Sequence, residues 1–254
     1  MIRISAVSYL NTKPFILGLQ RAAWWQEIEL SLETPAQTAL KLLSGEAQIG
    51  LVPVAVIPQL PNAQLISNYC IGTTGKVATV CLYSQVPLLQ IEQIWLDYQS
   101  RTSVQLLQIL CKHHWHIAPR FLPASEGFER QIEGSTAGLV IGDRAIALNT
   151  QFPYIYDLGE VWLQYAQLPF VFAAWVSTAP LSAHFEQQLN AAFADGLQHI
   201  DQVVQQYAAQ YPKYFDIKNY LCQNICYTFD QAQKTGLQRF WDLLNPNTHT
   251  HAAL

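Results

Sequence analysis

Polar residues close to the N-terminus give the first indication of chemistry. Ser8 and Asn11 follow a short apolar run at residues 1–4, a pattern typical of a strand that ends in a polar loop. Pro14 suits the first turn of a helix, where its missing N–H costs no hydrogen bond, and Asn11 or Thr12 would then be the N-cap. Because free backbone N–H groups at a helix start favour anions, this segment predicts one wall of an anion-binding site.

Three further segments repeat the arrangement of an apolar strand that runs into small polar residues. They are Gly72–Gly75, Ser100–Ser103 and Gly142–Asp143. Ligands of α/β sheets bind beyond the carboxyl ends of the strands, so the four segments are expected to meet around one crevice. Hydroxyls and helix starts at such a crevice favour a small, anionic, oxygen-rich ligand. The residues expected to bind it are Ser8, Tyr9, Thr74, Gly75, Ser100, Arg101, Thr102, Ser103, Gly142 and Asp143.

Several of these residues also have a purely structural interpretation. Ser100–Ser103 either caps a helix with Arg101 in solvent or forms a carboxylate clamp, in which Arg101 adds charge to hydroxyl and N–H donors. The three similar strand ends favour the clamp. Asp143 could act as a general acid or base, but a helix cap explains it equally well. The loop Gly72–Gly75 lacks the flanking residues of a nucleotide-binding P-loop, and a tight turn explains it as well as a ligand-facing one.

No metal or cofactor site is predicted. His113 and His116 share a helical face, but no carboxylate or thiolate completes a known ligand spacing, and the end of a helix is the better interpretation. Cys222 and Cys226 lack a second pair and are interpreted as ordinary buried thiols. The sequence also lacks the glycine fingerprint of dinucleotide sites and the motifs of serine hydrolases and zinc proteases. We therefore expect no cofactor.

The composition argues against nucleic acid as a partner, against a membrane span and against export. Only 13% of the 254 residues are charged and the net charge is −4, so nucleic acid is not an expected partner. No apolar run approaches about 18 residues, so no membrane span is expected. The chain begins directly with a strand, without the pattern of a signal peptide, and its five scattered cysteines fit reduced thiols. We therefore expect a cytoplasmic protein.

Helices and strands alternate in the first part of the chain. Thr34 as N-cap and Pro35 in the first turn open a helix that ends at Gly45, and an apolar strand follows at residues 49–54. This rhythm is typical of a parallel sheet. Further strands are expected at residues 30–32, 65–71, 77–83, 91–96, 138–141 and 170–176. Helices are expected at 14–24, from 100, from 142, and at 181–207, 211–220 and 228–244, before a frayed tail at 245–254.

Two long apolar strands, residues 77–83 and 170–176, bracket the middle of the chain. Their placement suggests an α/β fold with two lobes, in which both strands cross between the lobes as a double hinge and the ligand lies in the cleft. The predicted boundaries are a discontinuous first lobe, residues 1–83 with 175–254, and an inserted second lobe, residues 84–174.

Several motifs occur in an order that identifies a family. They are Ser8–Pro14, Leu43–Glu46 with Leu51–Pro53, Leu96–Asp97 with Ser100–Ser103, Ile141–Ala145, Tyr156–Glu160 with Trp162, and Leu168–Ala173. Together they cover most of the chain and resemble the menaquinone-biosynthesis chorismate dehydratases of the futalosine route. Several long motifs in the right order are more specific than any one of them.

The resemblance implies a fold like that of type 2 periplasmic binding proteins, with a central cleft and a double hinge, used as a lyase. The implied reaction removes water from chorismate, a dicarboxylate, to give 3-[(1-carboxyvinyl)oxy]benzoate without a redox cofactor or a metal. The family's active-site asparagine falls on Asn11. Its active-site serine falls on Thr79, where threonine keeps the hydroxyl but stiffens the side chain. We expect a monomer or a homodimer.

Three alternatives share the expected fold. A non-catalytic receptor for a small anion would need an export signal, and the sensing domain of a transcription regulator would need a DNA-binding module. The third is the sister enzyme of the same route, of the 1,4-dihydroxy-6-naphthoate synthase type, which acts on cyclic de-hypoxanthine futalosine. Residues 8–14 and 100–103 resemble the dehydratase better than this sister enzyme.

Overall fold

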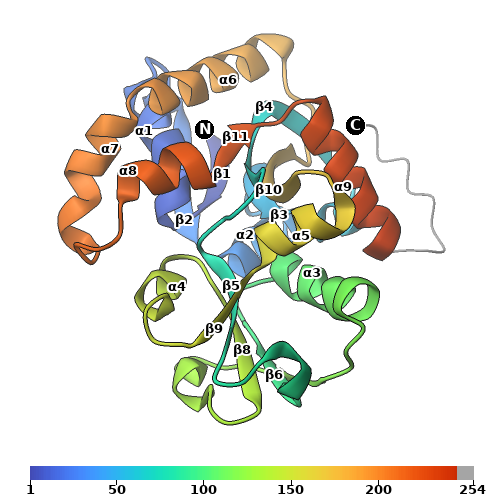
Figure 1. Ribbon diagram of the computed structural model, residues 1–254. Helices are drawn as coiled ribbons and strands as arrows, with labels where there is room; N and C mark the ends of the chain where they lie inside the picture. Colours follow the sequence, from blue (N-terminus) through green and yellow to red (C-terminus); the bar gives the residue numbers. More distant parts are fainter. Residues whose placement is uncertain (245–254) are drawn as a thin grey trace.

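Two β-sheets divide the chain into two α/β lobes (Figure 1). The computed structural model describes residues 1–244, and the fraying expected at residues 245–254 concerns residues outside this range. We call the upper lobe in Figure 1 lobe A and the lower one lobe B, after the sheets they contain. Within the described range, no helix is both long enough and apolar enough to span a membrane.

Sheet A is a mixed sheet. It contains β1 (Ile2–Val7), β2 (Ile28–Glu33), β3 (Ile49–Pro53), β4 (Gln64–Thr73), β10 (Phe170–Ser177) and β11 (Cys226–Thr228), in the order β11-β4-β10-β3-β1-β2. β1 pairs in parallel with both β2 and β3, which confirms the parallel rhythm predicted for this part of the chain. β10 runs antiparallel between β3 and β4, and β11 pairs antiparallel with β4.

Sheet B is also mixed. It contains β5 (Val80–Ser84), β6 (Gln93–Leu96), β7 (Arg120–Pro123), β8 (Thr136–Ile141) and β9 (Tyr154–Asp157), in the order β7-β6-β8-β5-β9. β6 pairs in parallel with β7 and β8. β5 runs antiparallel to both of its neighbours, β8 and β9.

Helices cover both sheets (Figure 1). They are α1 (Lys13–Arg21), α2 (Pro35–Leu43), α3 (Thr102–Leu110), α4 (Asp143–Leu148), α5 (Leu158–Ala166), α6 (Ala183–Gln198), α7 (Ile200–Tyr207), α8 (Ile217–Asn219) and α9 (Gln231–Leu244). The expected helix at 211–220 is reduced to α8 and a following π-turn, Tyr220–Asn224. The strands β7, β9 and β11 and the helix α5 were not expected from the sequence.

The start of α2 forms as the sequence predicts. Thr34 has extended backbone angles, its hydroxyl accepts from the Gln37 N–H, and the Gln37 side chain accepts from the Thr34 N–H. This reciprocal capping box satisfies two donors that the first helical turn would leave free. Pro35 takes the first position, and the strand that follows, β3, is buried along its whole length.

The two long apolar strands are central strands rather than crossing strands. All of β5 lies in sheet B between β8 and β9, and all of β10 lies in sheet A between β3 and β4. The chain therefore passes between the sheets at residues 74–79 and 158–169, which corrects the boundaries expected after residues 83 and 174. Both strands are fully buried within one sheet and, apart from Ser84 and Ser177 at their ends, consist of hydrophobic residues, so composition alone did not distinguish them from a hinge.

Helices α1 and α6 approach each other closely because each has a glycine at the contact. A Cβ atom at Gly18 would lie 1.9 Å from the carbonyl oxygen of Ala192, and one at Gly196 would lie 1.9 Å from that of Pro14. Only a residue without a side chain allows such an approach. The contact fixes the direction of α1, which begins two residues after Asn11.

Replacing Gly196 by alanine should lower the free energy of unfolding by about 3 kcal/mol, because the backbone of α1 has to move away from the added methyl group. Urea denaturation followed by circular dichroism measures this loss. Gly75→Ala is the matched control, since a Cβ atom there meets nothing within 4 Å. Equal losses in the two variants would show that the close helix contact is not the cause.

Candidate functional site

A cavity lies between the two sheets, where β1, β3, β6 and β8 end and β5 begins. The space between its lining residues is about 560 Å³, a figure that includes open solvent at its mouth. Its polar lining consists of Tyr9, Asn11, Thr12, Thr79, Ser100, Arg101, Thr102, Ser103 and Gly142, and its apolar lining of Val7, Pro35, Leu51, Pro53, Ile71, Val77, Val80, Ile141, Phe172 and Ala173. The structure thus brings together residues from three of the four strand ends identified in the sequence.

Asn11 lies on a short 3-10 helix, Leu10–Thr12, between β1 and α1. The Tyr227 hydroxyl donates to the Asn11 carbonyl oxygen at 2.9 Å, which fixes the backbone of this segment. The Asn11 side chain accepts a long hydrogen bond from the Thr12 hydroxyl at 3.4 Å and lies close to the Tyr220 hydroxyl. Its amide is therefore largely available to a ligand in the cavity.

Thr79 comes from the other lobe and directly precedes β5. Its hydroxyl lies 2.9 Å from the Tyr220 hydroxyl and 3.5 Å from the carbonyl oxygen of Val77. Ala78 has a φ of +65°, a conformation that costs a non-glycine residue roughly 1–3 kcal/mol and persists only where the surroundings enforce it.

Asp157 enforces this conformation. Its carboxylate accepts from the N–H groups of Val77 at 3.1 Å and Ala78 at 2.7 Å, and also from Gly159 and Glu160 at the start of α5. Burial raises the pKa of Asp157, and these N–H donors oppose the rise. One carboxylate therefore holds both the crossing segment and the helix start beside it.

The start of α3 supplies the segment Ser100–Ser103. The Ser100 hydroxyl accepts from the Ser103 N–H at 3.0 Å, and the Thr102 hydroxyl accepts from the N–H of Ala55 in lobe A at 3.2 Å. Arg101 is exposed and makes no side-chain hydrogen bond or ion pair with any residue in the range 1–244. Its guanidinium is thus available at the mouth of the cavity.

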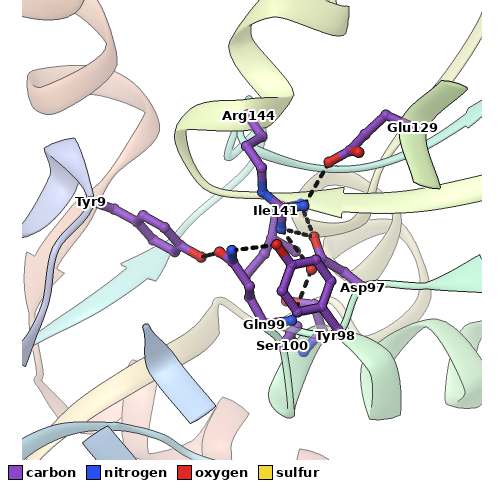
Figure 2. Close-up of polar contacts among 9 residues, drawn as sticks. Tyr9, Asp97, Tyr98, Gln99, Ser100, Glu129, Ile141 and Arg144 are labelled. Atoms are coloured by element: carbon purple, nitrogen blue, oxygen red, sulfur yellow. Dashed lines mark hydrogen bonds and ion pairs between the residues drawn. The ribbon is translucent and has the colours of Figure 1, made fainter. Parts of the chain in front are cut away.

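The buried Asp97 and the half-buried Arg144 form an ion pair behind this segment (Figure 2). Asp97 also accepts from the N–H groups of Ile141 and Gln99, at 2.9 and 3.0 Å. Burial raises the pKa of Asp97, and the Arg144 guanidinium opposes the rise. Arg144 also forms an ion pair with Glu129. Because Asp97 follows β6 and Ile141 is the last residue of β8, this network of charges and hydrogen bonds connects the ends of the two strands.

Tyr9 connects the two lobes across the cavity. Its hydroxyl donates to the Gln99 side chain at 2.6 Å, as Figure 2 shows, and burial raises its pKa well above the ordinary value. Its ring lies against Gly142, where an added Cβ atom would come within 2.7 Å of it. Gly142 also has a φ of +66° and donates its N–H to the Thr79 carbonyl oxygen at 2.8 Å, so this position requires glycine.

Four of the residues predicted to bind the ligand lie outside the cavity lining. Ser8 and Thr74 are exposed, and Gly75 lies in the turn after β4. The Asp143 carboxylate accepts from the Leu10 N–H and from the Tyr211 hydroxyl, the latter at 2.8 Å. Burial raises the pKa of Asp143. This carboxylate is thus engaged by the protein itself, between α4 and lobe A.

The cavity lining is nearly neutral. Among the described residues that form it, Arg101 is the only one with a charged side chain at neutral pH, and none is Asp, Glu, His, Lys or Cys. The rest of the lining consists of amide and hydroxyl groups and of the apolar side chains given above, which we call the floor. This arrangement can orient an anionic ligand by hydrogen bonds and exclude water, whereas it offers neither a carboxylate or imidazole base nor a thiol nucleophile.

Sequence reasoning missed several residues that position the site. Asp157 directly precedes α5 and could have been recognised as an N-cap, because its side chain accepts from the first N–H groups of that helix. Tyr220 and Tyr227 carry no local signal, since only the folded chain brings them to Thr79 and Asn11.

Comparison with solved structures shows a periplasmic-binding-protein-like fold. A protein from Archaeoglobus fulgidus matches with a TM-score of 0.74 and 15% identity, covering 96% of this chain and 97% of that one. The periplasmic aliphatic sulphonate binding protein of Escherichia coli matches with a TM-score of 0.65 and 14% identity, over 97% and 92%. A Candida albicans protein with the generic periplasmic binding protein fold matches with a TM-score of 0.63 and 9% identity, over 97% and 90%. The predicted fold class is thereby confirmed.

Comparison of sequences shows the family. A chorismate dehydratase of Thermus thermophilus is 28% identical over 261 aligned positions, which cover 91% of this chain and 96% of that protein. The family model for menaquinone biosynthesis matches residues 2–246. Because this match spans nearly the whole chain and agrees with the motifs found in the sequence, the chain belongs to the menaquinone biosynthesis family.

Proposed function

We propose that the protein is a chorismate dehydratase, a carbon–oxygen lyase that removes water from chorismate to give 3-[(1-carboxyvinyl)oxy]benzoate. The observation that carries this proposal is the cavity itself, whose lining combines Asn11, Thr79 and, among the described residues, one cationic side chain, Arg101. The Thermus thermophilus relative bears the name of this enzyme. Membership of the menaquinone biosynthesis family supports the same activity.

The chemical character of the cavity matches chorismate. The substrate has two carboxylates, for which the Arg101 guanidinium and the hydroxyls and N–H groups at the start of α3 are suitable partners. The apolar side chains of the floor, among them Phe172 and Ile71, fit the ring and the vinyl group. Binding of both ends of the molecule would hold it in one orientation between the lobes.

The reaction needs a proton acceptor and assistance for the departing hydroxyl group. In the proposed mechanism, the substrate's own side-chain carboxylate takes the proton from the ring carbon that bears the ether oxygen. The electron pair of that C–H bond forms a new ring double bond as the C–O bond of the hydroxyl on the adjacent ring carbon breaks, and the departing hydroxyl together with the proton taken by the carboxylate makes up the water that is released. Hydrogen bonds from Asn11 and Thr79 orient the substrate for this elimination. Because the product ring is aromatic, the step is strongly downhill.

Asn11→Ala should lower kcat/KM for chorismate dehydration by about 100-fold or more, because it removes a hydrogen-bonding group that faces the reacting atoms. The measurement is the formation of 3-[(1-carboxyvinyl)oxy]benzoate, followed by liquid chromatography and mass spectrometry. The melting temperature should change little, since the hydrogen bond that the side chain accepts from Thr12 is long.

Asn219→Ala is the control for this variant, because Asn219 is exposed on α8. Parental turnover by Asn11→Ala would disprove the role of this residue. If the unaltered, folded protein forms no product, the dehydratase proposal itself is wrong, and the sister enzyme's substrate and simple binding of anions become the alternatives to test.

Arg101→Ala should raise KM for chorismate by about tenfold or more with a much smaller change in kcat, because a charge-assisted contact to a carboxylate holds the substrate before and during the reaction. Steady-state kinetics at constant ionic strength separate the two constants. Arg130→Ala removes another exposed arginine, outside the cavity lining, and should leave both unchanged. An unchanged KM in the Arg101 variant would contradict the carboxylate contact.

The kcat of the enzyme should be independent of pH from about pH 6 to about pH 9 if the substrate supplies the base. No carboxyl, imidazole or thiol group is found among the described residues of the lining, and burial keeps Tyr9 protonated by raising its pKa. The substrate carboxylates are ionised throughout this interval. A descending limb below about pH 7 would instead indicate a protein base, and a rate–pH profile with purified enzyme distinguishes the two results.

A further inference from the structure

Tyr220 lies behind the cavity, within hydrogen-bond distance of Thr79 and near Asn11. It is 1% exposed and begins the π-turn Tyr220–Asn224. Its hydroxyl is 2.9 Å from the Thr79 hydroxyl, and the nearby Asn11 side chain acts to lower its pKa. The side chain does not line the cavity itself, so any effect on a ligand must pass through Thr79 or Asn11.

The direction of the hydrogen bond between the Tyr220 and Thr79 hydroxyls decides to which group the Thr79 hydroxyl can donate. Burial raises the pKa of Tyr220 well above its ordinary value, so its hydroxyl keeps its proton and can donate. When Tyr220 donates, the Thr79 oxygen is the acceptor, and the Thr79 proton must point elsewhere. The Thr79 proton can then point to the carbonyl oxygen of Val77, which lies 3.5 Å from the hydroxyl oxygen, or into the cavity.

The position of Tyr220 is fixed independently of its hydroxyl. Its ring packs against that of Phe215 with the centroids 5.3 Å apart, and the neighbouring Leu221 is fully buried. A phenylalanine at this position would keep these contacts and lose only the hydroxyl. The hydrogen bond to Thr79 can therefore be removed without emptying the core.

We propose that Tyr220 is a positioning residue, whose hydroxyl donates to Thr79 and so directs the Thr79 proton into the cavity, toward the hydroxyl group that leaves the substrate. The inference rests on the proposed function for its chemical consequence. Its structural part, the control of the Thr79 rotamer, stands apart from the identity of the substrate. Without the Tyr220 hydroxyl, Thr79 is free to rotate or to donate to Val77 instead.

A double-mutant cycle with Thr79→Val tests the kinetic consequence. Tyr220→Phe should lower kcat about tenfold, with KM changed less than about twofold, and should have no further effect once Thr79 is valine. Tyr227→Phe is the matched comparison, because this tyrosine is also buried but donates to the Asn11 carbonyl oxygen instead. Any effect of that variant should persist in the Thr79→Val background. Equal losses from Tyr220→Phe in both backgrounds, or a change in KM alone, would overturn the proposal.

The rotamer of Thr79 supplies a second measurement that requires no turnover. Three-bond couplings to the labelled Thr79 methyl group should indicate one rotamer in the unaltered protein and in Tyr227→Phe, and an average of rotamers in Tyr220→Phe. A single unchanged rotamer in Tyr220→Phe would refute the positioning role. If the unaltered protein fails to convert chorismate but the couplings change as expected, the proposed function is wrong and the positioning of Thr79 is right.

Discussion

The hydrogen bonds of the Asp157 carboxylate are the interaction on which the geometry of the cavity depends. This group accepts from two N–H groups of the segment that crosses between the lobes and from two at the start of α5. The unfavourable backbone conformation of Ala78 is thereby enforced. As a result, Thr79 leaves the crossing segment with its hydroxyl at the cavity, and β5 begins in register with β8 and β9. A buried carboxylate thus performs a structural task at the centre of the site.

The two lobes are held against each other mainly by neutral donors and single buried carboxylates. Tyr9 donates to Gln99, and Asp143 accepts from Leu10 and from Tyr211. The contacts of Gln99 and Asp143 with Tyr9 and Leu10 join lobe B to the two residues before Asn11. The same contacts therefore determine the separation of Asn11 from Thr79, and a change in how the lobes meet would alter the cavity before it altered either sheet.

The sequence was informative where local rules act. The capping box at Thr34 and Gln37, the buried strand β3 and the polar ends of β1 and β8 follow from side-chain types over a few residues. The lobe boundaries did not, because a fully buried central strand such as β10 has the same composition as a strand crossing between lobes. Tyr220 was equally inaccessible, since its partner Thr79 lies 141 positions away in the chain. Such contacts depend on topology, which periodicity does not encode.

Asp143 is another residue whose role could not be decided from the sequence. Its place after a glycine at a strand end suggested a ligand contact or a capping role, and the side chain instead satisfies the N–H of Leu10, in the other lobe. The polar residues at the four strand ends thus divide into those that line the cavity and those that hold its walls. Sequence can indicate that a polar group belongs to this edge of the sheet, whereas its hydrogen-bond partners decide which task it performs.

The small number of charges in the cavity has a physical rationale. An ionised base buried among Val77, Ile71 and Phe172 would be costly to desolvate unless it were paired, and the carboxylates near the site, Asp97, Asp143 and Asp157, are all engaged by N–H groups, hydroxyls or Arg144. A dicarboxylate substrate brings its own negative charges and needs only one cation and neutral donors to hold it. In the proposed mechanism the proton acceptor belongs to the substrate, so the protein's task is orientation and exclusion of water, for which a nearly neutral cavity between two sheets is well suited.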